Sequence, residues 1–566
     1  MENWRNVLLA CVLSMLVLFG WPIVANHFFP PANPPATKIV DGKSVPLPPP
    51  GEEAKPSAVL RARDVVLKDA PRIAIDTPRL KGSINLKGAR IDDLVLVDYR
   101  ETIAKSSPPV RLLSPSGAPD AYFAGFGWSG DGFTSPNDAT VWQSDDKLLA
   151  PGKPVTLTWR NEQGQIFTIR VSVDENYLFT IDQRVANASQ SGILVRPWSL
   201  VSRVGHSKDP DTTTIHVGPI GTFNGSTNYK TDFKDLDKGE APRFTSTGGW
   251  LGFGDKYWLT AIIPDQAKAF EGGFRKGSAE RYQADFTSNP VAVPAGKAVT
   301  SQSHFFAGAK EVFVLDSYAD KAGFVNFDRA IDWGWFIWFE KPIFYVLDWL
   351  FKLVGNFGVA IILLTIIVRG LMFPIAQKQF ASMAAMRAVQ PKMKELQERY
   401  KDDKQKMQQE LLALYQKEKV NPLAGCLPLI LQIPIFYALY KVLMLTIEMR
   451  HQPFIGWIKD LSAPDPMTPL NLFGLLDFTP PHFLAIGVLP ILLGITMYLQ
   501  FKLNPTPMDP VQQQVFSIMP WIFMFIMAPF AAGLQLYWTV SNLLTILQQK
   551  WLYSRHPALT AAEGKA

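Results

Sequence analysis

Six long apolar runs divide the chain, and polar sequence separates them. A helix that crosses a bilayer needs about 20 consecutive apolar residues, so runs of this kind predict transmembrane helices. The fifth run is the shortest: it spans about 24 Å as a helix, against a hydrocarbon core of about 30 Å. The runs are Val7–Phe29, Val359–Gln377, Asn421–Leu445, Phe483–Leu499, Val515–Phe530 and Leu534–Leu552. We therefore predict a polytopic α-helical membrane protein with six transmembrane helices.

The first run begins close to the start of the sequence, after a short head that carries Arg5. This pattern is typical of a cleaved signal peptide or of an uncleaved signal anchor. Ala25 could precede a cleavage site, but Ile23 is large where such a site needs a small residue. We therefore expect residues 1–29 to remain as an N-terminal transmembrane signal anchor. In both cases the sequence that follows is exported.

The next two segments differ in pattern. Residues 30–57 are rich in proline, which fixes φ and removes a hydrogen-bond donor, so they predict an extended linker without a core. Residues 58–316 alternate apolar and polar positions, as in Val155, Leu157 and Trp159 and again in Phe167–Val173. Period-two runs between turns of Gly, Pro, Asn and Asp predict a large exported all-β sandwich.

Four tryptophans and several charges share the segment from 331 to 358. Tryptophan favours the boundary between membrane and water, and we expect the charges to point outward from an apolar face. We predict that residues 317–354 form a connector and an interfacial amphipathic helix. An overlong transmembrane helix is the alternative, and Pro342 predicts two pieces or a kink. The tryptophans are Trp333, Trp335, Trp338 and Trp349.

A polar segment, residues 377–419, follows the second apolar run and is rich in lysine and arginine. Its helical pattern breaks around Lys401–Lys404, which predicts a helical hairpin. The loop Met449–Pro481 holds only Arg450 and Lys459 as basic residues, so the positive-inside rule places the hairpin in the cytoplasm. The same orientation puts both termini there. Residues 355–556 then form a five-helix core, followed by a C-terminal tail at 557–566.

Arg369 lies about ten residues into the second run, where a guanidinium costs roughly 2.5 to 3.5 kcal/mol. Its long side chain could reach the interface, a behaviour known as snorkelling. The other interpretation is a wet cavity lined by polar residues from three helices. Thr365 lies one turn before Arg369, and Gln432 lies within the third run. In the last run Tyr537 and Ser541 share one face, with Trp538 and Asn542 beside it. Polar residues that hold helices together are the plain alternative.

Composition narrows the choice of function. The chain has 566 residues, 47% of them hydrophobic, and a formal net charge of +6. Its two cysteines, Cys11 and Cys426, both lie in apolar runs, so we expect no disulfide framework. The apolar cores of the second to sixth runs contain no Asp or Glu, which disfavours a proton relay or a cation pathway. We find no nucleotide, metal-ligand or nucleophile motif, and therefore predict no enzyme, no catalytic residue, no cofactor and no metal site.

Three stretches carry a resemblance to a known family. They begin IVRGLMFPIAQKQF at Ile367, DPVQQQVFSIMP at Asp509 and GLQLYWTVSNLLTILQQ at Gly533. These motifs closely resemble the YidC/Oxa family of membrane protein insertases, in the form found in Gram-negative bacteria. The likeness is strongest from Phe336 to Tyr553. It extends to the layout of a first anchor followed by a long exported domain.

The resemblance implies that the chain inserts nascent inner-membrane proteins and helps them fold, alone or with the Sec translocon. Its partners would be nascent membrane proteins, the Sec translocon, ribosome–nascent chain complexes and the phospholipid bilayer, without sequence-specific binding of nucleic acid. It implies a place in the bacterial inner membrane with a periplasmic β-supersandwich domain. The hydrophilic groove of the family maps onto Arg369, Thr365, Gln432, Tyr537 and Trp538, and Ser541 and Asn542 complete our predicted substrate groove.

A small-solute transporter or channel is the alternative function. Such proteins are commonly built from inverted repeats or paired broken helices. The sequence contains no convincing repeat, so we favour the insertase and, with it, the wet groove over snorkelling for Arg369.

Overall fold

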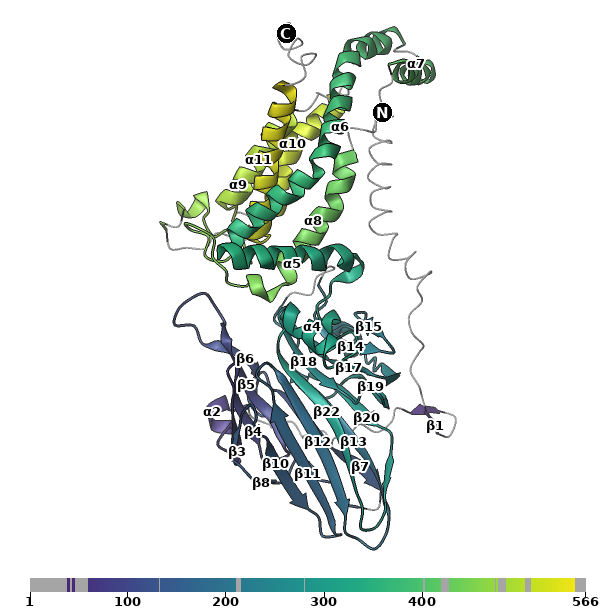
Figure 1. The fold of residues 1–566 in the computed structure, drawn as a ribbon, viewed down its shortest axis with the longest axis vertical. Helices are drawn as coiled ribbons and strands as arrows, with labels where there is room; N and C mark the ends of the chain where they lie inside the picture. The colour runs from purple at the N-terminus through teal and green to yellow at the C-terminus, as the bar shows by residue number, and fades with distance from the viewer. Residues whose placement is uncertain are drawn as a thin grey trace.

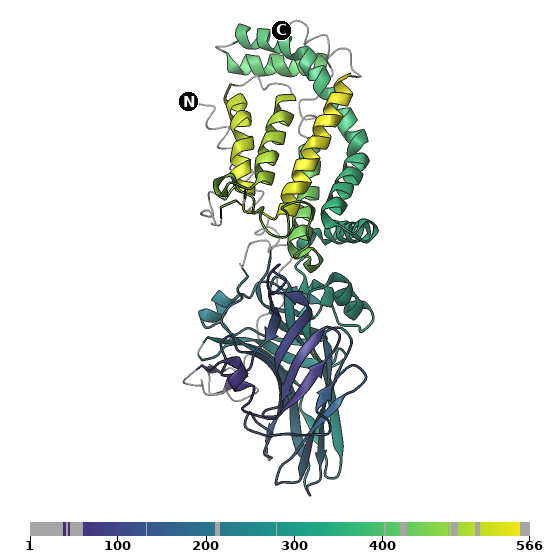
Figure 2. The ribbon, with the colours of Figure 1, turned by 90° about the vertical axis from the view of Figure 1, so that its left-hand side faces the viewer.

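Two bodies make up the described part of the chain, a β-domain and a helical bundle (Figures 1 and 2). The computed structural model describes residues 60–131, 133–209, 215–278, 280–400, 403–418, 427–473, 475–476, 485–503 and 510–554, and two short strands, β1 (Lys38–Val40) and β2 (Lys43–Val45). The signal anchor predicted for residues 1–29, most of the linker predicted for 30–57 and the tail predicted for 557–566 lie outside the described residues.

Within its described residues the β-domain consists of two large sheets, and all strand pairs within them are antiparallel except β3 with β9. In order, the first sheet contains β15 (Ser226–Asn228), β14 (Gly218–Phe223), β17 (Gly249–Gly254), β18 (Trp258–Ile263), β22 (Ala298–Ala309), β12 (Leu178–Asn187), β11 (Gln165–Val173), β10 (Val155–Arg160) and β8 (Gln143–Ser144). The second contains β16 (Arg243–Thr247), β19 (Ala269–Lys276), β20 (Arg281–Ser288), β13 (Ile193–Val204), β7 (Tyr122–Asp131), β5 (Arg90–Arg100), β4 (Leu80–Asn85), β3 (Arg72–Asp76) and β9 (Leu148–Leu149), with β21 (Val291–Val293) on β13 and β6 (Pro109–Leu113) on β5.

The register of β10 and β11 follows from the alternation of apolar residues. Val155 faces Val171 and Trp159 faces Phe167, so the predicted apolar positions share one face of the sheet. That face is buried, because alternate residues of β11 are buried along its whole length. Asp174 forms the turn that follows, where its Oδ1 accepts the backbone N–H groups of Asn176 at 2.9 Å and Leu178 at 3.0 Å. The predicted all-β sandwich is confirmed.

In the part of the chain that the structure describes, the β-domain also has three short helices, α2 (Arg63–Val66), α3 (Phe233–Asp237) and α4 (Val312–Asp320). The apolar face of α4, with Val312, Leu315 and Tyr318, is buried as part of the hydrophobic core. The ring of Tyr318 lies 6.0 Å from that of Phe306 on β22. The domain boundary predicted at residue 316 therefore falls inside a helix that packs on the sandwich.

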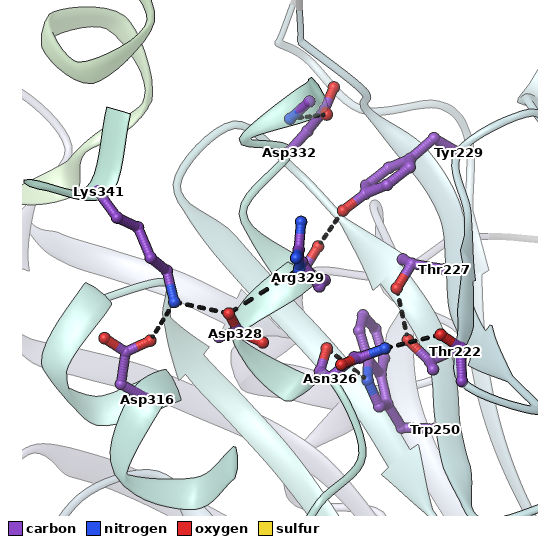
Figure 3. A network of polar contacts seen from close by, with 12 residues as sticks. Thr222, Thr227, Tyr229, Trp250, Asp316, Asn326, Asp328, Arg329, Asp332 and Lys341 are labelled. Carbon is purple, nitrogen blue, oxygen red and sulfur yellow. Dashed lines mark hydrogen bonds and ion pairs between the residues drawn. The ribbon is translucent and has the colours of Figure 1, made fainter. Parts of the chain in front are cut away.

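A polar network joins α4 to α5 (Ile337–Val354) through the 3₁₀-helix η1 (Phe327–Ala330) (Figure 3). The ammonium of Lys341 on α5 lies 2.9 Å from the carboxylate of Asp316 on α4 and 2.6 Å from that of Asp328 on η1. The hydroxyl of Tyr229 donates to the carbonyl of Arg329 at 2.6 Å. These contacts fix the first turns of α5 on the β-domain.

Helix α5 crosses the end of the bundle that faces the β-domain, and the 3₁₀-helix η2 (Gly334–Phe336) precedes it (Figure 1). It continues through Pro342 and does not divide there, although a proline at this position leaves the Trp338 carbonyl without its helical donor. Trp338 is 84% exposed, whereas Glu340 is fully buried. The helix thus presents aromatic rings outward and turns this carboxyl toward the protein, which differs from the outward charge that we expected.

The carboxyl of Glu340 has no hydrogen-bond partner in the described part of the chain. The nearby ammonium of Lys441 instead donates to the carbonyl of Asp332 at 2.6 Å. Burial raises the pKa of Glu340 to about 8, and the charge of Asp332 adds to the rise, while Lys441 opposes it. A buried carboxyl of this kind is stable in its protonated form and unfavourable when ionised.

We expect Glu340→Gln to stabilise the protein at alkaline pH. A pKa raised above its unfolded value means that the folded state holds the extra proton, so stability falls as the pH rises from about 4.5 to about 8. Glutamine removes this dependence. Thermal unfolding in detergent at pH 5, 7 and 9 should show similar midpoints for both proteins at pH 5 and a variant several degrees higher at pH 9. An equal loss of stability in both proteins between pH 5 and 9 would assign the pH dependence to other groups.

Among the described residues the bundle contains five long helices: α6 (Phe357–Arg399), α8 (Leu427–Leu445), α9 (Val488–Leu503), α10 (Pro510–Met527) and α11 (Ala532–Ser554). Judged by length and composition alone, one segment among the described residues could cross a membrane: Phe357–Gln377. Gln432–Leu445, Val488–Leu503 and Ser517–Met527 are shorter apolar helices. The 3₁₀-helices η4 (Ile447–Met449) and η5 (Pro469–Asn471) lie between α8 and α9.

Helix α6 continues far beyond its apolar part and ends at Arg399, and α7 (Lys404–Lys417) follows it. Asn356 caps the start of α6, where its side-chain Oδ1 accepts a hydrogen bond from the backbone N–H of Val359 at 3.1 Å. Val389 and Met393 of α6 are buried against Leu411, Leu414 and Tyr415 of α7. The two helices form a hairpin at the end of the bundle far from the β-domain (Figure 1).

A buried glutamine donates hydrogen bonds to the turn between α10 and α11. Gln535 is fully buried, and its Nε2 donates to the carbonyls of Met527 at 2.9 Å, Ala528 at 3.3 Å and Phe530 at 2.8 Å. Carbonyls at a helix C-terminus lack partners within the helix, so this amide replaces the donors that the end of α10 lacks.

Candidate functional site

Arg369 extends from α6 toward α11 and is half-buried there. Its Nε donates to the hydroxyl oxygen of Ser541 at 3.1 Å, and its Nη2 donates to the same oxygen at 2.5 Å. Among the described residues, no Asp or Glu forms an ion pair with it. The guanidinium is therefore held by a neutral hydroxyl, and its positive charge is not neutralised by a carboxylate.

A second polar contact joins α8 to α11. Nε2 of Gln432 donates to the hydroxyl of Tyr537 at 2.8 Å, and Tyr537 is only 2% exposed. Tyr537 lies four residues before Ser541, which puts both side chains on one face of α11 about 6 Å apart along its axis. A polar line thus runs from Arg369 on α6, across α11, to Gln432 on α8.

The three other predicted groove residues have different partners. The hydroxyl of Thr365 donates to the carbonyl of Ile361 within α6 at 2.6 Å. Asn542 donates from Nδ2 to the hydroxyl of Thr496 on α9 at 3.3 Å, because successive residues of a helix point about 100° apart. The ring of Trp538 packs against Phe436 of α8 and Phe523 of α10, with centroids 4.2 Å and 4.5 Å away. The structure brings together Arg369, Ser541, Tyr537 and Gln432.

Beside Arg369 an open pocket of about 430 Å³ lies between α6 and α11. Its walls are mainly apolar, and Leu547 is 63% exposed. Gln548 adds a buried Nε2 that has no hydrogen-bond partner in the described part of the chain. The lining residues are Ile366, Arg369, Gly370, Phe373, Leu544, Leu547, Gln548 and Trp551.

Our predicted site did not include the apolar walls of this pocket. Leu544, Leu547, Gln548 and Trp551 recur at intervals of three and four residues, so one face of α11 carries them all. This spacing was visible in the sequence. The partner surface on α6, with Phe373 and Gly370, could not be found this way, because only the packed structure shows which face of α6 meets α11.

The site can bind through charge, hydrogen bonds and apolar contact. A guanidinium without an acidic partner attracts anionic groups, and the amide of Gln548 offers a second donor. The apolar walls suit hydrophobic side chains. No group of three or more His, Cys, Asp or Glu residues in the described part of the chain could hold a metal ion.

Two protein-family models match this chain. The model described as the 60Kd inner membrane protein matches residues 349–559, and the model of the YidC periplasmic domain matches residues 72–346. The boundary between the two matches falls within α5, between residues 346 and 349.

Similar proteins are known from several bacteria. The membrane protein insertase YidC of Zymomonas mobilis subsp. mobilis is 53% identical over 565 residues, with 99% of this chain and 97% of the relative covered. That of Beijerinckia indica subsp. indica is 45% identical over 587 residues, with 98% and 96% covered. A crystal structure of an active YidC insertase with its first transmembrane domain resolved covers 95% of this chain and 98% of its own, at 18% identity and a TM-score of 0.36.

Both matched domain models and the identity over almost the full length lead to the same family, which also accounts for the β-domain beside a helical bundle. The chain belongs to the YidC family of membrane protein insertases, which are inner-membrane proteins with a periplasmic domain.

Proposed function

We propose that this chain inserts nascent inner-membrane proteins into the bilayer and helps them fold. The observation that carries the proposal is the position of Arg369. It is held by Ser541, without an ion pair to a carboxylate among the described residues, at the edge of an open pocket with apolar walls. A fixed charge beside an apolar surface suits a substrate with one hydrophilic and one hydrophobic part.

The mechanism follows from the cost of moving polar chain through hydrocarbon. A hydrophilic segment loses much of its hydration when it enters a bilayer, and each unpaired polar group costs several kcal/mol by order of magnitude. The polar line formed by Arg369, Ser541, Tyr537 and Gln432 offers partners part of the way across. The apolar segment then leaves sideways past Leu547 and Trp551 into lipid. No covalent step is required.

The partners and the topology belong to the same proposal. The substrates are nascent membrane proteins that arrive as ribosome–nascent chain complexes or from the Sec translocon, and the bilayer receives them. The hairpin of α6 and α7 and both termini lie in the cytoplasm, where the hairpin can meet a chain before it enters the groove. The exposed basic side chains of the hairpin, such as Lys392 and Arg399, support this side of the membrane.

Reconstitution of the purified protein alone in vesicles tests the function. We expect a small single-span substrate with a short hydrophilic tail to become protease-protected only in vesicles that contain the protein. Empty vesicles and vesicles with the Arg369→Glu variant are the controls. Flux of small solutes without any insertion would support a transporter or channel and contradict the proposal.

The topology predicts how the hairpin can be labelled. In a variant with Cys11 and Cys426 replaced by serine, a single Asp403→Cys change places a thiol at the start of α7. An impermeant maleimide should leave this thiol unmodified in intact spheroplasts and modify it after lysis. A Lys297→Cys change on the exposed part of the β-domain is the matched control and should react in intact spheroplasts. Reaction of Asp403→Cys before lysis would place the hairpin in the periplasm.

A further inference from the structure

A large open cavity lies where the periplasmic domain meets the bundle. Its volume is about 590 Å³, and two segments line it: the end of β5 with the loop after it, and the loop that follows α8. Its charged and titratable side chains are Asp98, Tyr99, Arg100, Glu448, Arg450, His451 and Lys459. The cavity is distinct from the pocket beside Arg369, with which it shares no lining residue.

The cavity lies beside the parts of the bundle that we expect at the bilayer surface. A hydrogen bond connects the loop after α8 to the start of α6: Nδ2 of Asn356 donates to the carbonyl of Phe454 at 3.0 Å. Helix α5 ends just before that point and carries Trp338 and Trp349, 84% and 61% exposed, as expected for residues at the membrane–water boundary. Figure 1 shows the same end of the bundle facing the β-domain. Ile103, 56% exposed, adds an apolar edge to the cavity.

The cationic side chains of the cavity form no ion pairs within the described residues. Arg450 donates to the carbonyl of Arg100 at 2.8 Å and to that of Glu101 at 3.2 Å, and its guanidinium lies over the ring of Trp258 at 5.3 Å. Arg100 donates to the carbonyl of Ser107 at 2.6 Å. Lys459 is exposed. Neutral partners orient the two arginines, and among the described residues no carboxylate lies within ion-pair distance of these cations, so together they can bind an anion.

One carboxylate in the cavity has an unused oxygen. Oε1 of Glu448 accepts the backbone N–H of Val312 at 3.0 Å, while its Oε2 is buried with no partner in the described part of the chain. Asp98, by contrast, lies 3.6 Å from the guanidinium of Arg79, and the imidazole of His451 lies 3.8 Å from Asp460. Burial raises the pKa of Glu448 to about 7, and a cationic donor in the cavity would satisfy the unused oxygen and stabilise the ionised form.

We propose that this cavity binds the headgroup of a phospholipid in the periplasmic leaflet, one that joins a phosphodiester to a primary ammonium. Arg450 and Lys459 bind the phosphate, and Oε2 of Glu448 accepts a hydrogen bond from the ammonium. Phosphatidylethanolamine has both groups. The quaternary ammonium of phosphatidylcholine has no N–H to donate, and the headgroup of phosphatidylglycerol has no cation. The lipid is the source because the cavity opens at the bilayer surface beside an exposed apolar side chain.

Lipid binding to the purified full-length protein in a nonionic detergent tests the proposal. Short-chain phosphatidylethanolamine, phosphatidylglycerol and phosphatidylcholine are titrated, and binding is measured by native mass spectrometry and by the shift in melting midpoint. We expect phosphatidylethanolamine to bind about tenfold more tightly than the other two lipids, because one additional charge-assisted hydrogen bond contributes about that factor in affinity. Equal binding of all three lipids would overturn the proposal.

Two variants and a control assign the contacts. Glu448→Gln keeps an oxygen for the N–H of Val312 but loses the negative charge, so the preference for phosphatidylethanolamine should disappear while phosphatidylglycerol binds as before. Lys459→Gln changes an exposed residue and should weaken the binding of all three lipids. Lys297→Gln, an exposed lysine elsewhere on the β-domain, should have no effect. A preference that survives in Glu448→Gln would rule out that carboxylate as the ammonium partner.

A last titration tests whether the cavity binds the lipid or a soluble compound with the same headgroup. Glycerophosphoethanolamine carries the same headgroup without acyl chains, and we expect it to bind far more weakly than the lipid. Equal affinity for the two would show that the site takes a free headgroup compound and would overturn the lipid as its occupant.

Discussion

Replacing Arg369 with glutamate is expected to abolish insertion, whereas replacing it with lysine retains most of the activity. The guanidinium has no ion pair with a carboxylate among the described residues, so its charge acts on the substrate, and a glutamate in its place reverses the sign of that charge. Two unit charges 4 Å apart interact by about 4 kcal/mol at the effective dielectric constant of a protein surface. The side chain changes from attracting acidic tails to repelling them. Lysine keeps the charge but cannot donate to Ser541 from two nitrogens.

The measurement compares the insertion of substrates that differ only in the charge of their translocated tail. At equal expression, Arg369→Ala should reduce insertion of acidic tails at least about tenfold and reduce that of neutral tails less. Ser541→Ala is the matched control, because it removes the acceptor and leaves the charge. Full activity of Arg369→Glu on acidic tails would exclude electrostatic guidance and leave Arg369 as a residue that keeps the groove hydrated.

Gln535→Glu is expected to destabilise the helical bundle strongly. The glutamine donates to three carbonyls at the end of α10, and a carboxylate there would face three oxygens without a hydrogen to share. A buried charge without a partner costs about 3 to 5 kcal/mol, which corresponds to about 10 °C in melting midpoint. Thermal unfolding of the detergent-solubilised protein measures the loss.

Comparison of Gln535→Met with Gln535→Glu separates the effect of the buried charge on stability from the effect of the lost hydrogen bonds. Methionine is similar in length, removes the three donations and adds no charge, so we expect about half the loss in melting midpoint. Lowering the pH should restore part of the stability of Gln535→Glu, because a protonated carboxyl can donate once. Equal melting of the two variants at neutral pH would show that the charge adds nothing to the lost hydrogen bonds.

The sandwich and the bundle could be predicted because their signals are local. Alternation in Phe167–Val173 fixes which side chains of β11 are buried, and the long apolar runs mark the helices. The order of strands within the sheets could not be predicted. β22 lies between β18 and β12, far apart in sequence, and that pairing depends on how two whole sheets pack.

The candidate site was only partly predictable for a similar reason. Helical spacing places Tyr537 and Ser541 on one face, but it does not say that Ser541 meets Arg369 while Asn542 turns to Thr496. Glu340 shows the same limit. Its sequence context is that of an amphipathic helix, and only the packing of α5 against α8 shows that this carboxyl is buried.

Helix α6 carries both Arg369 and the first arm of the hairpin without interruption, over 43 residues or about 65 Å. The direction in which the hairpin points is therefore set by the number of residues between them. One residue inserted after Gln377 would swing the hairpin by about 100° around the helix axis, whereas seven would return it to within about 20°. Natural changes in the length of this arm should therefore be changes of seven, eleven or eighteen residues, which keep the direction of the hairpin to within about 20°, whereas one or two residues would turn it away.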